Sequence, residues 1–184
     1  MTVEDLPLPG LKLVKPRIFE DGRGFFAETY REDRYREAGM DARFVQDNHS
    51  RSRVGTLRGM HFQTTPGQAK LIRVVTGEIF DVAVDIRPDS ATFGQWHAVR
   101  LAAQDHHQLY IPVGFAHGFC VLSETADVLY KVSSVYDPKT ESGFRWDDAD
   151  VAIRWPIEKP VVSPRDADAM SFGDLRRLLG VSCT

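Results

Sequence analysis

The chain has 184 residues, of which 42% are hydrophobic and 27% charged, values typical of a globular protein with room for a sizeable core. Its net charge of −3 argues against general nucleic-acid binding, and no apolar run approaches the length of a membrane span. The first ten residues lack the order of a signal peptide and only two cysteines occur, Cys120 and Cys183, so we expect a cytoplasmic protein without a structural disulfide.

Short β-prone runs alternate with turns along most of the chain. In chain order we predict strands at residues 25–30, 54–63, 71–75, 78–87, 96–101, 108–112, 118–122, 128–135 and 151–153. The clearest signal is the alternation of Phe80, Val82, Val84 and Ile86 with Asp81, Ala83, Asp85 and Arg87. Only Thr76-Gly77 separates this run from the strand at 71–75, so we predict that the two form a hairpin.

Helix signals are few and short. We predict one helix at 31–38, ended by Gly39, and a second at 171–179, where the apolar residues have helical spacing and Gly180 follows. Residues 175–184 are expected to form a terminal helix on the surface. Many short strands with few helices indicate an all-β sandwich or barrel, for which a jelly roll is the natural candidate. Without repeats, low-complexity tracts or linkers, residues 1–184 are expected to form one domain.

One segment, DNHSRSRVGTLRGMHFQ at residues 47–63, concentrates cationic and titratable side chains. It contains two histidines and three arginines, and no carboxylate follows Asp47. Such a segment is suited to hold an anion and to place one imidazole, that of His61, beside it for proton chemistry. His117, at the end of the turn Pro112–His117, is the second candidate. The other histidines are expected to have no catalytic part: His97 on a strand, His106 and His107 in a polar turn.

The spacing P-x-G-x-x-H at residues 112–117 resembles the second signature of the cupin superfamily, whose fold is a small jelly-roll barrel. Metal-binding cupins carry H-x-H in their first signature, whereas here His61 is followed at the second position by Gln63. Two histidines without a third good ligand make a poor transition-metal site, so we expect no metal and no cofactor. The histidines are then available for acid–base chemistry, although either one alone could simply be a buried, hydrogen-bonded side chain.

Seven segments together resemble the dTDP-4-dehydrorhamnose 3,5-epimerase family. They occur in the family's order from about Asp21 to Asp166: DGRGFF at 21–26, QDNHS at 46–50, LRGMHFQ at 57–63, GEIFDVAVD at 77–85, IPVGFAHG at 111–118, LYK at 129–131 and RWDD at 145–148. Each is weak alone, and the set is highly specific. The resemblance implies an isomerase that epimerises dTDP-4-keto-6-deoxy-D-glucose at C3 and C5, next to the C4 ketone, in dTDP-L-rhamnose or related deoxysugar biosynthesis.

The chemistry requires a base on one face of the sugar, a cation or donor at the enolate oxygen and an acid on the other face. By resemblance, His61 is the base, paired with Asp166, although Asp168 is a rival for that pairing. Tyr130 is then the acid on the opposite face, and Lys70 stabilises the enolate oxygen. From the sequence alone, Tyr130 could equally be a core aromatic residue.

The resemblance also implies substrate-binding residues for the sugar, the pyrophosphate and the base. These are Arg23, Glu28, Gln46, Asp47, Asn48, Arg58, His117, Tyr136, Glu141 and Arg165, with Tyr136 matching the aromatic side chain that stacks on thymine. Strict alternation would put Arg58 and His61 on opposite faces of their strand. We therefore predict an irregularity, with Gly59 as the place for a bulge. One of Asp81 and Asp85 is a candidate partner for His117.

Other functions are compatible with the same residues. A 3-only or 5-only epimerase of a deoxysugar pathway would share the catalytic groups and differ in pocket shape. A non-catalytic or metal-binding cupin that holds a sugar or a small anion is the alternative from another class. Expected partners are the dTDP-sugar and, by resemblance, a second copy in a homodimer with exchanged strands and Arg23 reaching the neighbour's site; no nucleic acid or membrane is expected.

Overall fold

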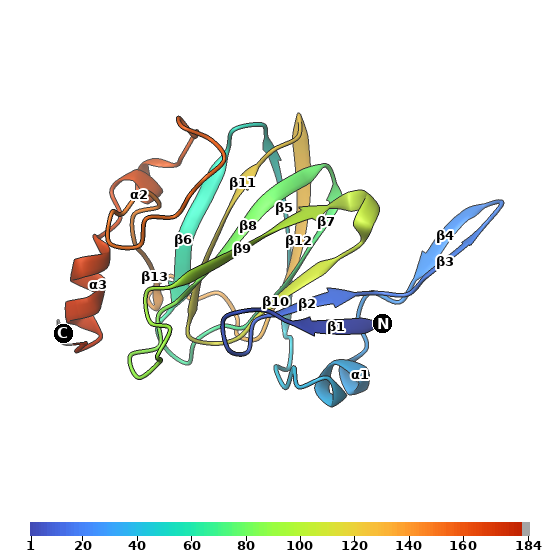
Figure 1. Cartoon of the computed structure of the whole chain (residues 1–184), viewed down its shortest axis with the longest axis horizontal. Helices are drawn as coiled ribbons and strands as arrows, with labels where there is room; N and C mark the ends of the chain where they lie inside the picture. The colour runs from blue at the N-terminus through green and yellow to red at the C-terminus, as the bar shows by residue number, and fades with distance from the viewer. Residues whose placement is uncertain (182–184) are drawn as a thin grey trace.

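The computed structural model describes residues 1–181, in which two antiparallel sheets face each other as a jelly roll (Figure 1). The first sheet has the order β1 (Thr2–Asp5), β2 (Lys12–Lys15), β10 (Gln108–Ile111), β7 (Lys70–Thr76), β12 (Thr125–Val132) and β5 (Gln46–Arg53). The second has the order β13 (Glu141–Gly143), β6 (Leu57–Gln63), β11 (Phe115–Val121), β8 (Glu78–Asp85) and β9 (Trp96–Ala102). The predicted all-β fold is confirmed, and a 3-10 turn, Ala103–Asp105, precedes β10.

The main core lies between the two sheets. Ile72 and Val74 of the first sheet pack with Ile79 and Phe119 of the second, and all four are at most 4% exposed. The alternating run at β8 is a strand, as predicted, but both of its faces are buried. Its barrel-facing side carries Asp81 and Ala83, whereas the apolar residues of the alternation pack against the C-terminal segment: Val82, Val84 and Ile86.

The predicted hairpin between 71–75 and 78–87 is wrong. β7 pairs with β10 and β12, whereas β8 pairs with β11 and β9, so the two strands belong to different sheets. Gly77, at φ +77°, turns the chain from one sheet into the other, and a Cβ there would lie 2.0 Å from the carbonyl oxygen of Thr125. A one-residue connection can therefore cross between layers when glycine allows the close approach of another strand.

The C-terminal segment covers the outer face of the second sheet (Figure 1). It contains α2 (Pro164–Ala167) and α3 (Phe172–Leu178), and α3 is the helix predicted at 171–179, with Ser171 as its capping residue. The strand predicted at 151–153 is wrong, because the chain turns there and Val151 is buried against α3. Part of the terminal helix predicted at 175–184 lies outside the described residues, as does Cys183.

A hairpin of β3 (Ile18–Asp21) and β4 (Gly24–Ala27) projects from the body of the protein (Figure 1). The β-prone run at 25–30 is therefore an exposed arm, in which Phe25 is 61% and Phe26 68% exposed. The predicted first helix is confirmed as α1 (Glu32–Glu37), at the base of the arm. Among residues 1–181, no helix is both long and apolar enough to cross a membrane.

Candidate active site

A cavity of about 250 Å³ opens between the two sheets. Its walls come from β5 and β12 on one side, β6 and β11 on the other, and the segment between β12 and β13 at the mouth. The lining residues are Gln46, Asn48, Ser50, Arg58, His61, Gln68, Lys70, His117, Phe119, Tyr130, Tyr136 and Glu141. Nine of them are residues that the sequence analysis singled out, and they come from segments separated by up to 95 positions in the chain.

His61, on β6, is held from behind by a carboxylate of the C-terminal segment. Its Nε2 lies 2.7 Å from Oδ1 of Asp166, whereas Asp168 is exposed at the end of α2. Burial would raise the pKa of Asp166, but the hydrogen bond and charge of His61 and the amide of Gly59 outweigh it and hold that pKa below its usual value. An ionised Asp166 can only accept, so Nε2 of His61 donates and Nδ1 is left to accept a proton.

The irregularity predicted at Gly59 is confirmed. Two steps along β11, from His117 to Phe119, pair with three steps along β6, from His61 to Arg58. Gly59 has φ +136°, and a Cβ there would lie 2.5 Å from the Cα of Gly118, so only glycine fits. The extra residue turns Arg58 and His61 toward the same cavity, which strict alternation would have prevented.

His117 and Lys70 are the most buried polar groups of the cavity. Nε2 of His117 lies 2.9 Å from Oδ1 of Asp81, which settles the sequence-based choice between Asp81 and Asp85. Burial lowers the pKa of His117, although the charge and hydrogen bond of Asp81 oppose the shift. Burial also lowers the pKa of Lys70 to about 8, against the opposing charges of Asp81 and Glu141. Lys70 is therefore a cation in a poorly solvated place at neutral pH.

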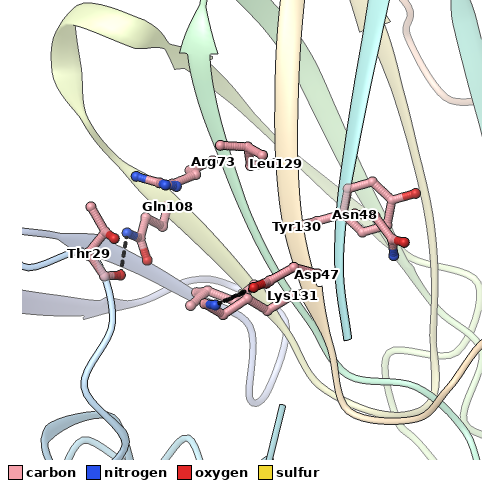
Figure 2. Close-up of a pocket in the computed structure, with 9 residues that line it drawn as sticks. Thr29, Asp47, Asn48, Arg73, Gln108, Leu129, Tyr130 and Lys131 are labelled. Atoms are coloured by element: carbon pink, nitrogen blue, oxygen red, sulfur yellow. Dashed lines mark hydrogen bonds and ion pairs between the residues drawn. The ribbon is translucent and has the colours of Figure 1, made fainter. Parts of the chain in front are cut away.

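Tyr130 comes from the facing sheet. On β12 its neighbours Leu129 and Lys131 point to the outer surface, and Figure 2 shows the side chains of Tyr130 and Asn48 on the other side of the sheet. Tyr130 thus lines the cavity wall opposite that of His61. Burial raises the pKa of Tyr130, so the phenol keeps its proton at neutral pH. A base and a proton donor on opposite walls can act on the two faces of one bound molecule.

Polar and aromatic side chains gather at the cavity mouth. Nη1 of Arg165 lies 2.7 Å from Oε2 of Glu141, and this contact, with other hydrogen bonds, holds the pKa of Glu141 below its usual value despite burial. Tyr136 is 50% exposed beside them, and its backbone amide donates to Gln46 at 3.0 Å. A half-exposed aromatic ring next to a guanidinium can hold a heterocyclic base and a phosphate.

Three of the predicted substrate-binding residues are not near this cavity within one copy of the chain. Arg23 lies at the tip of the β3–β4 arm and pairs with Asp21. Glu28 pairs with Arg34 near α1. The side chain of Asp47 points to the outer surface of the first sheet, where it pairs with Lys131 at 2.9 Å (Figure 2).

Sequence reasoning missed several cavity residues. Ser50, Gln68 and Phe119 line the cavity without having been named, and Gln63 lies just behind it, with its Nε2 donating to Thr140 at 3.1 Å. The signal for Ser50 was present, since it alternates with Gln46 and Asn48, but β5 is polar on both faces and was not predicted as a strand. Among residues 1–181, no group of three His, Cys, Asp or Glu side chains is placed to hold a metal ion.

The jelly roll and the acid–base groups of its cavity define an epimerase of the cupin type. The chain belongs to the dTDP-4-dehydrorhamnose 3,5-epimerase family, whose family model matches residues 5–174. It is 52% identical over 167 residues to a dTDP-4-dehydrorhamnose 3,5-epimerase of Neisseria gonorrhoeae, covering 90% of this chain but only 51% of that relative, so it spans about half of that protein's length.

Two further comparisons bear on the site. The crystal structure of a 3,5-epimerase from Legionella pneumophila in complex with dTDP-4-keto-L-rhamnose has a TM-score of 0.93 and 46% identity, covering 97% of this chain and 96% of that one. A dTDP-4-dehydrorhamnose 3-epimerase of Streptomyces niveus is 40% identical over 178 residues, which is 96% of this chain and 86% of that protein. Close relatives therefore include enzymes named for one inversion as well as for two.

Proposed function

We propose that this protein inverts C3 and C5 of dTDP-4-keto-6-deoxy-D-glucose, in the formation of dTDP-L-rhamnose or a related deoxysugar. One observation carries the proposal: His61 and Tyr130 line opposite walls of a single cavity that also contains the buried Lys70. A hexose held between them would present one face to each. The membership of the chain in the 3,5-epimerase family supports the same substrate class.

In the proposed cycle, each of the two carbons loses one proton and then gains another. Nδ1 of His61 accepts the proton from the carbon next to the ketone, and the electron pair of that C–H bond passes to the C4 oxygen as an enolate. Asp166 stabilises the imidazolium that forms. The ammonium of Lys70 stabilises the enolate oxygen. The hydroxyl of Tyr130 then gives its proton to the same carbon from the opposite face, which inverts it.

The phenol is a suitable acid although its pKa is high. An unperturbed tyrosine has a pKa of about 10, and burial raises that of Tyr130. The carbanion-like carbon of an enolate is a stronger base than a phenolate, so transfer toward carbon is downhill. A raised pKa also keeps Tyr130 protonated at neutral pH, as the donor role requires.

The nucleotide would occupy the mouth. Tyr136 would stack on thymine, Arg58 and Arg165 would bind the pyrophosphate, and three polar side chains would bind the sugar and ribose: Gln46, Asn48 and Glu141, with His117 at the hexose. Asp47 would contribute through its backbone, because its side chain lies on the outer face.

Arg23 and Glu28 would complete the site from a second copy of the chain. The β3–β4 arm exposes Phe25 and Phe26, and β5, the last strand of its sheet, leaves one edge open to another chain (Figure 1). A homodimer that covers the arm would explain both features. Light scattering should give the mass of two chains, and replacing both phenylalanines with serine should give one; a wild-type monomer at micromolar concentration would contradict the dimer.

The decisive experiment is incubation with the dTDP-4-keto-6-deoxy sugar in D2O, followed by mass and NMR analysis. Deuterium at C3 and C5 of an inverted product supports the proposal. Deuterium at one carbon alone identifies a single-site epimerase, the variant that the Streptomyces niveus relative makes a real alternative. No exchange at either carbon, together with bound metal in the purified protein, would favour a non-catalytic or metal-binding cupin.

Tyr130→Phe adds a sharper test of the two-face mechanism. His61 would still remove a proton and return it to the same face, so exchange with solvent should continue while inversion is lost. Inversion at the wild-type rate in this variant would rule out Tyr130 as the acid.

We further propose that the protein acts in the cytoplasm and folds as one domain over residues 1–184.

A further inference from the structure

Gln63 stands where metal-binding cupins would carry a ligand, and it is 8% exposed at the end of β6. A buried amide needs hydrogen-bond partners, because an unpaired one costs about 1–3 kcal/mol. Its partners all lie in two segments. Nε2 donates to Oγ1 of Thr140 at 3.1 Å, and Oε1 accepts from the amide of Gln68; the hydroxyl of Ser134 lies 3.5 Å from Oε1 but donates to the carbonyl of Gly67 at 3.0 Å.

Ser134 and Thr140 lie near the two ends of the segment 133–141, which runs from β12 to β13 and carries Tyr136 and Glu141 at the cavity mouth. The segment is stabilised within itself at its far end, where Asp137 accepts from the amides of Lys139, Thr140 and Glu141. Its attachment to the barrel combines backbone bonds with bonds from side-chain amides.

Three glutamine side chains contribute to that attachment, beside the backbone bonds of Ser133 to Ala69 and of Thr64 to Thr140. Gln46 accepts from the backbone amide of Tyr136 at 3.0 Å. Gln63 bonds Thr140 near one end of the segment directly and reaches the other end through Gln68, whose Nε2 donates to the carbonyl of Ser134 at 3.0 Å. An apolar residue at position 63 could fill the same space but could not fix the two ends of the segment relative to the barrel.

We propose that Gln63 is a positioning residue, which holds segment 133–141 so that Tyr136 and Glu141 face the nucleotide. The inference rests on the proposed function, since it takes the mouth to be the dTDP subsite. Gln63 does not line the cavity, whereas the groups used in the proposed cycle do: His61 two residues earlier on β6, Lys70 on β7 and Tyr130 on β12.

Loss of the Gln63 hydrogen bonds should weaken binding and leave the rate of the chemical steps nearly unchanged. Gln63→Met keeps the volume and removes the hydrogen bonds, so the Kd for dTDP and the KM for the keto sugar should rise about 3- to 10-fold, while kcat stays within about twofold. Thr140→Val removes one of the same bonds from the other side and should show a smaller change in the same direction. Combining the two should cost less than the product of the single effects, because they share one bond.

Thr64→Val is the matched control. It also removes a threonine hydroxyl that reaches segment 133–141, by a 3.2 Å bond to the carbonyl of Thr140, but the backbone amide of Thr64 bonds the same oxygen at 2.9 Å. It should leave Kd, KM and kcat unchanged. Hydrogen exchange should report faster opening of 133–141 in Gln63→Met than in Thr64→Val, at a temperature at which all variants are folded.

The outcomes distinguish failure of the proposed function from failure of the role assigned to Gln63. If the wild-type protein does not bind dTDP, the proposed function fails. If it binds dTDP and Gln63→Met binds it equally well while melting at a lower temperature, Gln63 only supports the fold and the inference is wrong. If kcat falls at unchanged KM and Kd, Gln63 acts on the proton-transfer groups and the inference is also wrong.

Discussion

The cavity is built around two histidine–aspartate pairs that make the same contact in different surroundings. Nε2 of His61 lies 2.7 Å from Asp166, and Nε2 of His117 lies 2.9 Å from Asp81. The side chain of His61 is 29% exposed and its carboxylate comes from the C-terminal segment, 105 residues away. His117 and Asp81 are neighbours on adjacent strands of one sheet, 9% and 0% exposed.

The difference shows that a hydrogen bond to a carboxylate does not by itself make a histidine a catalytic base. A catalytic base must take a proton and release it again within each turnover, which requires access to solvent or substrate and a carboxylate that stabilises the cation. His61 has both. Burial holds the pKa of His117 below its usual value, so this ring stays neutral at physiological pH and acts as a fixed hydrogen-bonding group beside the sugar.

Replacing each histidine should separate the two roles most strongly. His61→Asn should lower turnover about 10³-fold, because it removes the general base, with little change in affinity for dTDP. His117→Asn keeps hydrogen-bonding atoms and should lower turnover by only about tenfold. Steady-state kinetics on the keto sugar and calorimetry with dTDP measure both. Equal losses of turnover in the two variants would show that His61 and His117 do not differ in role.

The two carboxylates provide the second test. Asp166→Asn cannot stabilise an imidazolium and should lower kcat about 100-fold, while the folded state keeps its Ser163 cap through the backbone amide of residue 166. Asp81→Asn should change kcat less than tenfold. A kcat for Asp81→Asn lower than that for Asp166→Asn would mean that the buried pair carries the proton chemistry.

Much of this arrangement was predictable from the sequence. The strand alternation gave the sheet class, and the bulge at Gly59 followed from a conflict between alternation and chemistry at Arg58 and His61. The pairing of strands did not follow, because Gly77 permits either a hairpin or a crossing between sheets, and only the packing of distant strands decides.

The parts of the site that the sequence left undecided have physical reasons. β5 carries polar residues on both faces because one face lines the cavity and the other the outer surface, so no hydrophobic period marks it. The pairing of His61 with Asp166 over Asp168 depends on α2, a four-residue helix too short to leave a periodic signal. Alternation could not choose between Asp81 and Asp85 as the partner of His117, because residues four apart share one face of a strand.

The C-terminal segment offers a third test, since it brings Asp166 to His61. Leu175, fully buried on α3, anchors it to the second sheet, whereas Leu109, 1% exposed, lies between the sheets. Each change to alanine should reduce the free energy of unfolding by about 2–5 kcal/mol. At a temperature at which both variants are folded, only Leu175→Ala should also lower kcat. An equal effect of Leu109→Ala on kcat would show general loosening instead.

A pH dependence set by Lys70, the buried cation of the cavity, should be the weakest of these effects. Burial lowers its pKa from 10.5 to about 8, and only the ammonium form can stabilise an enolate, so kcat/KM should fall about fivefold between pH 8 and pH 9. The free energy of unfolding should change in the opposite direction as the pH rises. Between about pH 8 and 10.5 the unfolded chain binds the Lys70 proton and the folded chain does not, so the contribution of Lys70 to stability rises with pH. Lys70→Arg stays charged and should abolish the alkaline fall; if the fall persists unchanged in that variant, another group titrates and the assignment of Lys70 to the enolate oxygen loses its support.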